Sequence, residues 1–99
     1  MHRDRDDMIC DRCLQVIGER LTESDWEVIF ALQKGGTMNK SALMTMTGLS
    51  ISDVRDSVWR LFGGCLIYLT RRGKETLMKL TPSAIRLREL QEQAYREEA

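Results

Sequence analysis

Breaks in the pattern of apolar residues divide the middle of the chain into short pieces, and this division constrains the fold more than any other sequence feature. The earlier pieces have apolar residues at steps of three and four, the spacing of an amphipathic helix. The later pieces are rich in β-forming residues and flank a turn, which predicts a hairpin. The breaks that separate the pieces are Gly35-Gly36, Gly48-Leu49-Ser50, Gly63-Gly64 and Gly73.

Capping residues mark where the three central helices are expected to begin. Thr22 starts the first, because Asp25 stands three residues later as in a capping box. Asn39 is expected to cap a helix over residues 40–47. Ser50 is expected to cap a helix over residues 50–62, with Asp53 as its partner. The side chains predicted to face the core are Trp26, Ile29, Phe30, Leu32, Leu43, Met46, Leu49, Val54, Val58, Leu61 and Phe62.

A β-hairpin is predicted after the third helix, with strands over residues 65–70 and 75–81. Its four-residue turn carries Arg71, Arg72 and Lys74 around Gly73. The order helix, helix, turn, helix, hairpin describes a winged helix-turn-helix. The predicted fold class is therefore α+β, mostly α, with this module between N- and C-terminal helices.

The two flanking helices are predicted from spacing and from a proline. Over residues 82–98 the cap is Thr81, and Pro82 occupies the first position, where a missing N–H does no harm. Leu87, Leu90 and Ala94 form the apolar stripe of that helix. The N-terminal helix is predicted over residues 7–21, and its apolar stripe is Cys10, Cys13, Leu14, Ile17 and Leu21.

The 99 residues are predicted to form one domain. Residues 1–6 alternate in charge and are expected to be disordered, which leaves 7–99 as a single unit: the helix 7–21, the core 22–81 and the helix 82–98. The formal net charge is zero. However, residues 40–80 hold seven Lys/Arg and three Asp/Glu, a net charge of +4. Positive charge is thus concentrated where a DNA-facing surface would lie.

Composition also argues against several classes of protein. No run approaches the roughly 18 apolar residues of a membrane span, and the polar first residues do not suit a signal peptide, so a cytoplasmic location is expected. Three cysteines, an odd number, suit a reducing compartment. The only histidine is His2, and no glycine-rich phosphate loop follows a strand. Neither enzymatic activity nor a cofactor is therefore predicted.

The chain resembles the winged helix-turn-helix regulators of the MarR and PadR type. The likeness covers about two thirds of the chain. It rests on residues 49–62, on the hairpin Tyr68-Leu69-Thr70-Arg71-Arg72-Gly73-Lys74 and on Leu80-Thr81-Pro82. The resemblance implies a DNA-binding transcriptional regulator that acts as a homodimer.

Two groups of residues are predicted to contact double-stranded DNA. The helix 50–62 is expected to enter the major groove, where Arg can bind guanine and Asp can accept from cytosine. The hairpin tip is expected to hold the backbone or the minor groove. The predicted contact residues are Ser50, Ser52, Arg55, Asp56, Trp59, Arg60, Arg71, Arg72 and Lys74.

A different function is also open. Winged helices can bind proteins instead of DNA. The zero net charge and the two acids that offset two arginines on the helix 50–62 fit that use, with Trp59 as an aromatic anchor. The terminal helices are expected to pair between two chains in a homodimer. The alternative is that they fold back on their own core.

The cysteines allow three interpretations. Cys10 and Cys13 are predicted to fill space on the buried side of the first helix. A redox pair and a metal site are the alternatives. A closed metal site would need more ligands, for which only Cys65 and His2 are available.

Overall fold

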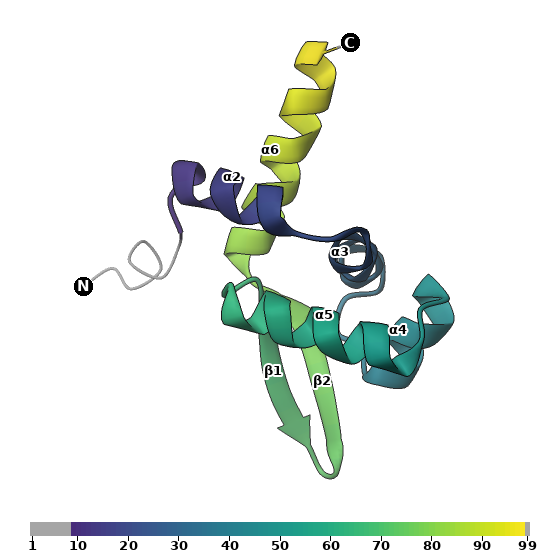
Figure 1. Ribbon diagram of the computed structural model, residues 1–99. Helices are drawn as coiled ribbons and strands as arrows, with labels where there is room; N and C mark the ends of the chain where they lie inside the picture. The colour runs from purple at the N-terminus through teal and green to yellow at the C-terminus, as the bar shows by residue number, and fades with distance from the viewer. Residues whose placement is uncertain (1–8, 99) are drawn as a thin grey trace, which may run out of the picture.

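The computed structural model describes residues 9–98, so the predicted disorder of residues 1–6 lies outside the described residues. It confirms the predicted fold class, mostly helical with one antiparallel hairpin (Figure 1). No helix in the described range is long and apolar enough to cross a membrane. The elements are α2 (Asp11–Arg20), α3 (Glu23–Gly35), α4 (Lys40–Thr47), α5 (Ile51–Gly63), β1 (Ile67–Arg72), β2 (Glu75–Leu80) and α6 (Pro82–Glu98).

The elements form two groups around the core (Figure 1). The helices α3, α4 and α5 pack together above the hairpin, while α2 lies across the first turns of α6. The far half of α6 projects beyond the rest of the molecule. The largest apolar side chains that are fully buried are Leu14, Val28, Ile29, Leu32, Leu43, Val54, Leu61, Leu66 and Met78.

The predicted helix starts are confirmed for the central helices. The amide of Asp25 donates to Thr22 Oγ1 at 3.2 Å, and the amide of Thr22 donates to Asp25 Oδ2 at 3.0 Å, which completes the capping box. The amide of Ala42 donates to Asn39 Oδ1 at 2.8 Å. Only half of the predicted pair at α5 forms. The amide of Asp53 donates to the Ser50 hydroxyl at 3.1 Å, without a return bond between these two residues.

Three side chains predicted to be buried are instead partly exposed: Phe30, Met46 and Phe62. Phe30 and Phe62 each follow a buried residue, and neighbouring residues on a helix point about 100° apart. Met46 lies beside the exposed Thr45 near the end of α4. The core is narrow enough to cover only the central stripe of each helix. Phe30 is partly covered in another way, since it stacks on Trp26 and lies under the guanidinium of Arg88, 4.6 Å from the ring centroid.

The first described helix differs most from its prediction. It begins at Asp11, with Cys10 as the N-cap, and residues 7 and 8 of the predicted span lie outside the described residues. Cys10 and Cys13 are both exposed, so the prediction that they fill the buried side is wrong. The helix contacts the core through one narrow stripe, in which Leu14 is fully buried and Ile17 half-buried.

The hairpin turn is shorter than predicted. Its turn consists of Gly73 and Lys74 only, with Gly73 at a positive φ of 66°, as the first position of a type II′ turn requires. Arg71 and Arg72 therefore belong to β1, paired with Thr76 and Glu75, and point to opposite faces of the hairpin. Arg71 shares the face of the buried Ile67, and Arg72 lies on the outer face.

Gly48 is expected to tolerate a side chain poorly. Its φ is 76°, in the left-handed region, although no described atom outside its own chain neighbours would come within 4 Å of an added Cβ. Gly48→Ala is therefore expected to lower the free energy of unfolding by about 1 kcal/mol through backbone strain alone. Urea denaturation would measure this. The control is Gly63→Ala, which is equally open and has no positive φ, and is expected to be neutral or stabilising.

Candidate nucleic-acid interface

A hollow of about 270 Å³ lies between α5, the hairpin and the start of α4. Its apolar lining comes from Val58, Trp59 and Leu69. Three cationic side chains from three different elements line it: Lys40 of α4, Arg55 of α5 and Arg71 of β1. The fold thus brings three positive charges together around one hollow beside α5.

Packing on the inner side holds each of these cations in place. Arg55 follows Val54, which is fully buried and anchors the start of α5. Arg71 extends along β1 from the half-buried Leu69. Lys40 reaches the hairpin because the chain just before it pairs with β2. Met38 and Met78 exchange two backbone hydrogen bonds, of 3.0 and 2.8 Å.

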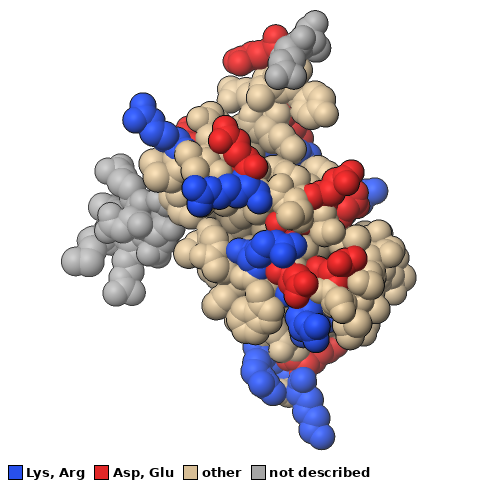
Figure 2. Space-filling model, viewed as in Figure 1, with Lys and Arg blue, Asp and Glu red and all other residues tan. Residues whose placement is uncertain are grey.

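A second hollow of about 250 Å³ continues toward the hairpin tip. It shares Lys40 and Thr76 with the first and adds Lys74. The side-chain amide of Asn39 donates to the carboxylate of Glu75 here, which ties the cap of α4 to the hairpin. Lysine and arginine side chains gather at the hairpin end of the molecule in Figure 2. Together the two hollows extend from α5 to the tip, lined by four cations, Lys40, Arg55, Arg71 and Lys74, and by one acid, Glu75.

The cations that line the two hollows are not engaged in ion pairs within residues 9–98. Within residues 9–98 the ion pairs involve only Arg60, Arg86 and Arg88. The cations that line the two hollows, Lys40, Arg55, Arg71 and Lys74, form none. Polyanions bind such surfaces by releasing counterions.

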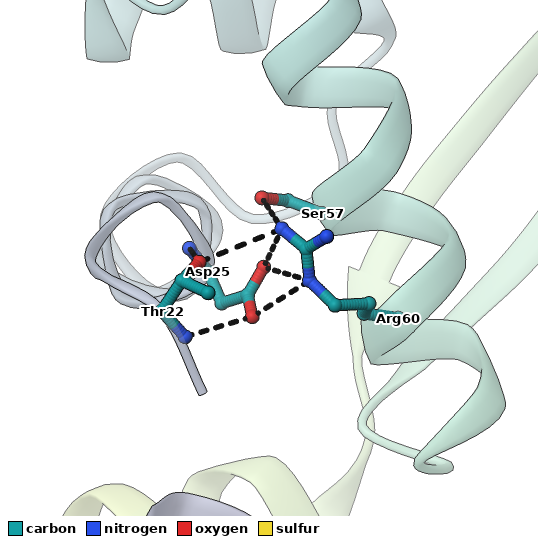
Figure 3. A network of polar contacts seen from close by, with 4 residues as sticks. All are labelled: Thr22, Asp25, Ser57 and Arg60. Atoms are coloured by element: carbon teal, nitrogen blue, oxygen red, sulfur yellow. Dashed lines mark hydrogen bonds and ion pairs between the residues drawn. The ribbon is translucent and has the colours of Figure 1, made fainter. Parts of the chain in front are cut away.

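Arg60 has a different environment from that predicted for a DNA-facing residue (Figure 3). Its guanidinium donates three hydrogen bonds to Asp25, from Nε to both carboxylate oxygens at 3.1 Å and from Nη2 to Oδ1 at 3.0 Å. Nη2 also donates to the Ser57 hydroxyl at 3.3 Å. Asp25 is fully buried, whereas the Arg60 side chain is 46% exposed. These bonds join α5 to the first turn of α3.

The Asp25 carboxylate is held in its charged form. Burial raises its pKa, but the hydrogen bonds from Arg60 and from the Thr22 amide outweigh burial and leave the pKa below the ordinary value of 3.8. The same contact raises the pKa of Arg60. The pair therefore stays ionised at neutral pH.

The remaining predicted residues lie on the outer side of α5. Ser52, Asp56 and Trp59 are exposed, and Trp59 is 61% exposed with its ring edge against Phe62. The Ser50 hydroxyl is exposed but already accepts from the Asp53 amide. Sequence reasoning missed Lys40 and Thr76, because nothing in the local sequence connects the start of α4 with the hairpin. The bridge between Met38 and Met78 makes that connection in space.

The cysteines lie outside this interface. Cys10, Cys13 and Cys65 are exposed free thiols. In the described part of the chain no three Cys, His, Asp or Glu side chains come together as a metal site. His2, the other candidate ligand, lies outside the described residues.

Solved structures of DNA-binding proteins share this fold, although no protein-family model and no curated protein matches the sequence. BpsR from Bordetella bronchiseptica, whose DNA binding is regulated by 6-hydroxynicotinic acid, is similar with a TM-score of 0.73, at 20% identity over 96% of this chain and 69% of its own. A probable transcriptional regulator from Pseudomonas aeruginosa has a TM-score of 0.69, at 26% identity over 83% of this chain and 63% of its own.

TubR from Bacillus thuringiensis serovar israelensis, bound to 24 bp of tubC, has a TM-score of 0.67, at 23% identity over 84% of this chain and 91% of its own. The chain thus spans nearly the whole of TubR but under two thirds of the Pseudomonas regulator. These similarities confirm the resemblance to winged-helix regulators of the MarR type at the level of the fold.

Proposed function

We propose that this protein binds double-stranded DNA as a homodimeric transcriptional regulator. The single observation that carries the proposal is the convergence of Lys40, Arg55 and Arg71, from three elements, around one hollow beside α5. Charges gathered from separate elements onto one concave face suit a polyanion better than scattered surface charges do. The similarity to TubR, whose structure holds DNA, supports the same reading of the fold.

In this proposal α5 enters the major groove and the hairpin holds the adjacent backbone or minor groove. Arg55 is the residue proposed to reach a base, since it is exposed and near the start of α5. Ser52, Asp56 and Trp59 would lie along the same groove. Lys40, Arg71, Arg72 and Lys74 would bind phosphates. Arg60 would act indirectly, by setting the position of α5 against α3 through Asp25.

The dimer is proposed to form through the terminal helices, with α6 as the main contact. Its apolar inner stripe includes Ala84 and Leu87, which are buried, and continues into Ala94 and Tyr95, which are exposed. This stripe therefore runs past the end of its own core, on the part of α6 that projects from the molecule (Figure 1). A second copy of α6 would cover it. The contact of α2 with α6 within one chain would be retained.

Tyr95 provides a direct test of this dimer. Tyr95→Glu places a charge on the exposed end of the stripe and is expected to raise the dimer dissociation constant about 30-fold, the cost of one aromatic anchor. Light scattering across a dilution series would measure it. The control is Gln93→Glu, which adds the same charge on the opposite side of α6 and should leave the dimer intact. Equal effects of both variants would rule out this face as the interface.

The decisive experiment on DNA binding is the affinity of the purified protein for a random-sequence duplex between about 50 and 200 mM salt. A dimer with several phosphate contacts on each protomer should lose affinity by about a thousandfold or more over this range. Selection of a preferred sequence from a random pool would follow. No binding at low salt would contradict the proposal.

A protein-interaction module is the second candidate, and one observation favours it. Trp59 and Phe62 form an exposed aromatic pair on α5, with ring centroids 6.2 Å apart, and aromatic side chains are enriched at the centres of protein interfaces. A specific protein partner that requires Trp59, together with the absence of DNA binding at low salt, would favour this function over the first.

A further inference from the structure

Cys10 and Cys13 form an exposed pair of thiols at the start of α2, and neither contributes to the proposed DNA interface or to the core. Cys10 is the N-cap residue and Cys13 the third residue of the helix. An N-cap side chain points toward the backbone of the second or third helical residue, which places the Cys10 thiol beside Cys13. A disulfide requires Cβ atoms about 3.5–4.5 Å apart.

Hydrogen bonds to α6 on both sides of Cys10 fix the backbone at the start of α2, and so fix the position of the thiol pair. The amide of Ile9 donates to the Ser83 hydroxyl at 3.1 Å, and Arg86 donates to Asp11 at 2.7 and 3.0 Å. Cys10 itself has extended backbone angles, φ −66° and ψ 157°, and its side chain makes no capping hydrogen bond. Its sulfur can therefore move toward Cys13 without breaking a turn of helix.

The two thiols differ in acidity. The amide and the thiol of Cys13 lie close enough to the Cys10 sulfur to hold the pKa of Cys10 below its ordinary value of 9.0. The neighbouring Cys10 in turn raises the pKa of Cys13. Cys10 is thus the better source of thiolate, and Cys13 keeps its proton to a higher pH. This is the division of roles that a dithiol needs for exchange.

We propose that Cys10 and Cys13 form a thiol–disulfide exchange site that reacts with low-molecular-weight disulfides such as oxidised glutathione. The Cys10 thiolate attacks one sulfur of the small disulfide, which forms a mixed disulfide and releases one small thiolate. Cys13 then loses its proton to water and attacks the Cys10 sulfur, which expels the second small thiolate. The protein dithiol loses two electrons and two protons, and the small disulfide becomes two thiols. The reaction does not depend on DNA binding.

Cys65 serves as an internal reference for this chemistry. It is exposed and free like the other two, but it follows Gly64 at a turn and has no second thiol three residues away. A lower pKa accelerates the attacking thiol only partly, since nucleophilicity falls with basicity. For a thiol whose pKa lies above neutral, each unit by which the pKa is lower raises the exchange rate at neutral pH by about threefold. Cys10 is therefore expected to react several-fold faster than Cys65.

The test is incubation of the reduced full-length protein with oxidised glutathione at pH 7, followed by alkylation and peptide mass spectrometry. The wild type is expected to form the Cys10–Cys13 disulfide with no glutathione bound to either. The Cys13→Ser variant is expected to trap glutathione on Cys10. In the Cys10→Ser variant, Cys13 is expected to react with glutathione no faster than Cys65 does. Both variants should fold, since serine is a preferred N-cap and both side chains are exposed.

Either of two results would overturn the proposal. One is a wild-type protein in which glutathione accumulates on Cys10 without resolution by Cys13. The other is a Cys13→Ser variant in which Cys10 reacts no faster than Cys65. A thermal unfolding transition in each variant will establish that it is folded. A negative result can then be attributed to the thiol pair and not to loss of the fold.

Discussion

Replacing Asp25 by alanine is expected to lower the free energy of unfolding by about 3 kcal/mol. The change leaves the Arg60 guanidinium and the Thr22 amide without their acceptor, and loss of one partner of a buried ion pair costs about 3–5 kcal/mol. The lower end is expected because Arg60 is half exposed and can turn to water. In a domain of this size the melting temperature should fall by roughly 12–24 °C, measured by circular dichroism.

A neighbouring carboxylate provides the control. Glu23 lies in the same first turn of α3, is exposed, and forms no hydrogen bond or ion pair through its side chain with residues 9–98. Glu23→Ala is expected to change stability by less than about 0.5 kcal/mol. If Asp25→Ala also costs less than about 1 kcal/mol, the contact between α3 and α5 does not hold the helix-turn-helix together.

The pH dependence of stability follows from the direction of the Asp25 shift. Because its pKa is lowered on folding from about 3.8, the carboxylate contributes stability that is complete above that value and is lost as pH falls through the folded pKa. The stability difference between the wild type and Asp25→Asn should therefore be constant from neutral pH to about pH 4 and shrink only below it. A difference that already shrinks near pH 6 would show that Asp25 is not the titrating group.

Removing the three cations of the hollow is expected to weaken binding of a random-sequence DNA duplex by about a thousandfold near 100 mM salt. The variant is Lys40→Ala/Arg55→Ala/Arg71→Ala, which loses three proposed DNA contacts on each protomer. Because Lys40 and Arg71 are the proposed phosphate contacts among the three, the slope of log affinity against log salt should become shallower by about 3.6 for a dimer. All three side chains are exposed, so stability should change little.

A charge-matched control separates position from net charge. Arg12→Ala/Arg20→Ala/Lys34→Ala removes three exposed cations from α2 and α3, which do not line either hollow. Its affinity should fall by less than about threefold, since those charges act on DNA only at long range. Equal losses in both variants would mean that binding depends on overall charge, and the assignment of the interface to the hollow would be wrong.

The order of elements could be predicted because each depends on residues a few positions apart. The Thr22–Asp25 capping box, the Asn39 cap and the positive φ of Gly48 are all local. Burial was harder to predict at the edges of the stripes. Phe30 and Phe62 are apolar, but the core is too narrow to reach them, and a helical pattern does not give its width.

The candidate site could be predicted only in part. Arg71, Arg72 and Lys74 are adjacent in the sequence, and the hairpin keeps them close in space. Arg60 carries the same charge as Arg55 and stands on the same helix, but it lies within reach of Asp25 because α3 crosses α5 there. A helical wheel records the direction of a side chain and not the element that faces it.

The local sequence therefore determined the helices, their caps and the hairpin, because these depend on backbone hydrogen bonds and spacing within one turn or one strand pair. The tertiary structure alone decided which charges act together. Lys40 lines the same hollow as Arg71 because Met38 pairs with Met78, and Arg60 bonds to Asp25 because a buried carboxylate requires a partner. Both contacts join residues more than 30 positions apart, a separation at which packing and not local pattern sets the distance.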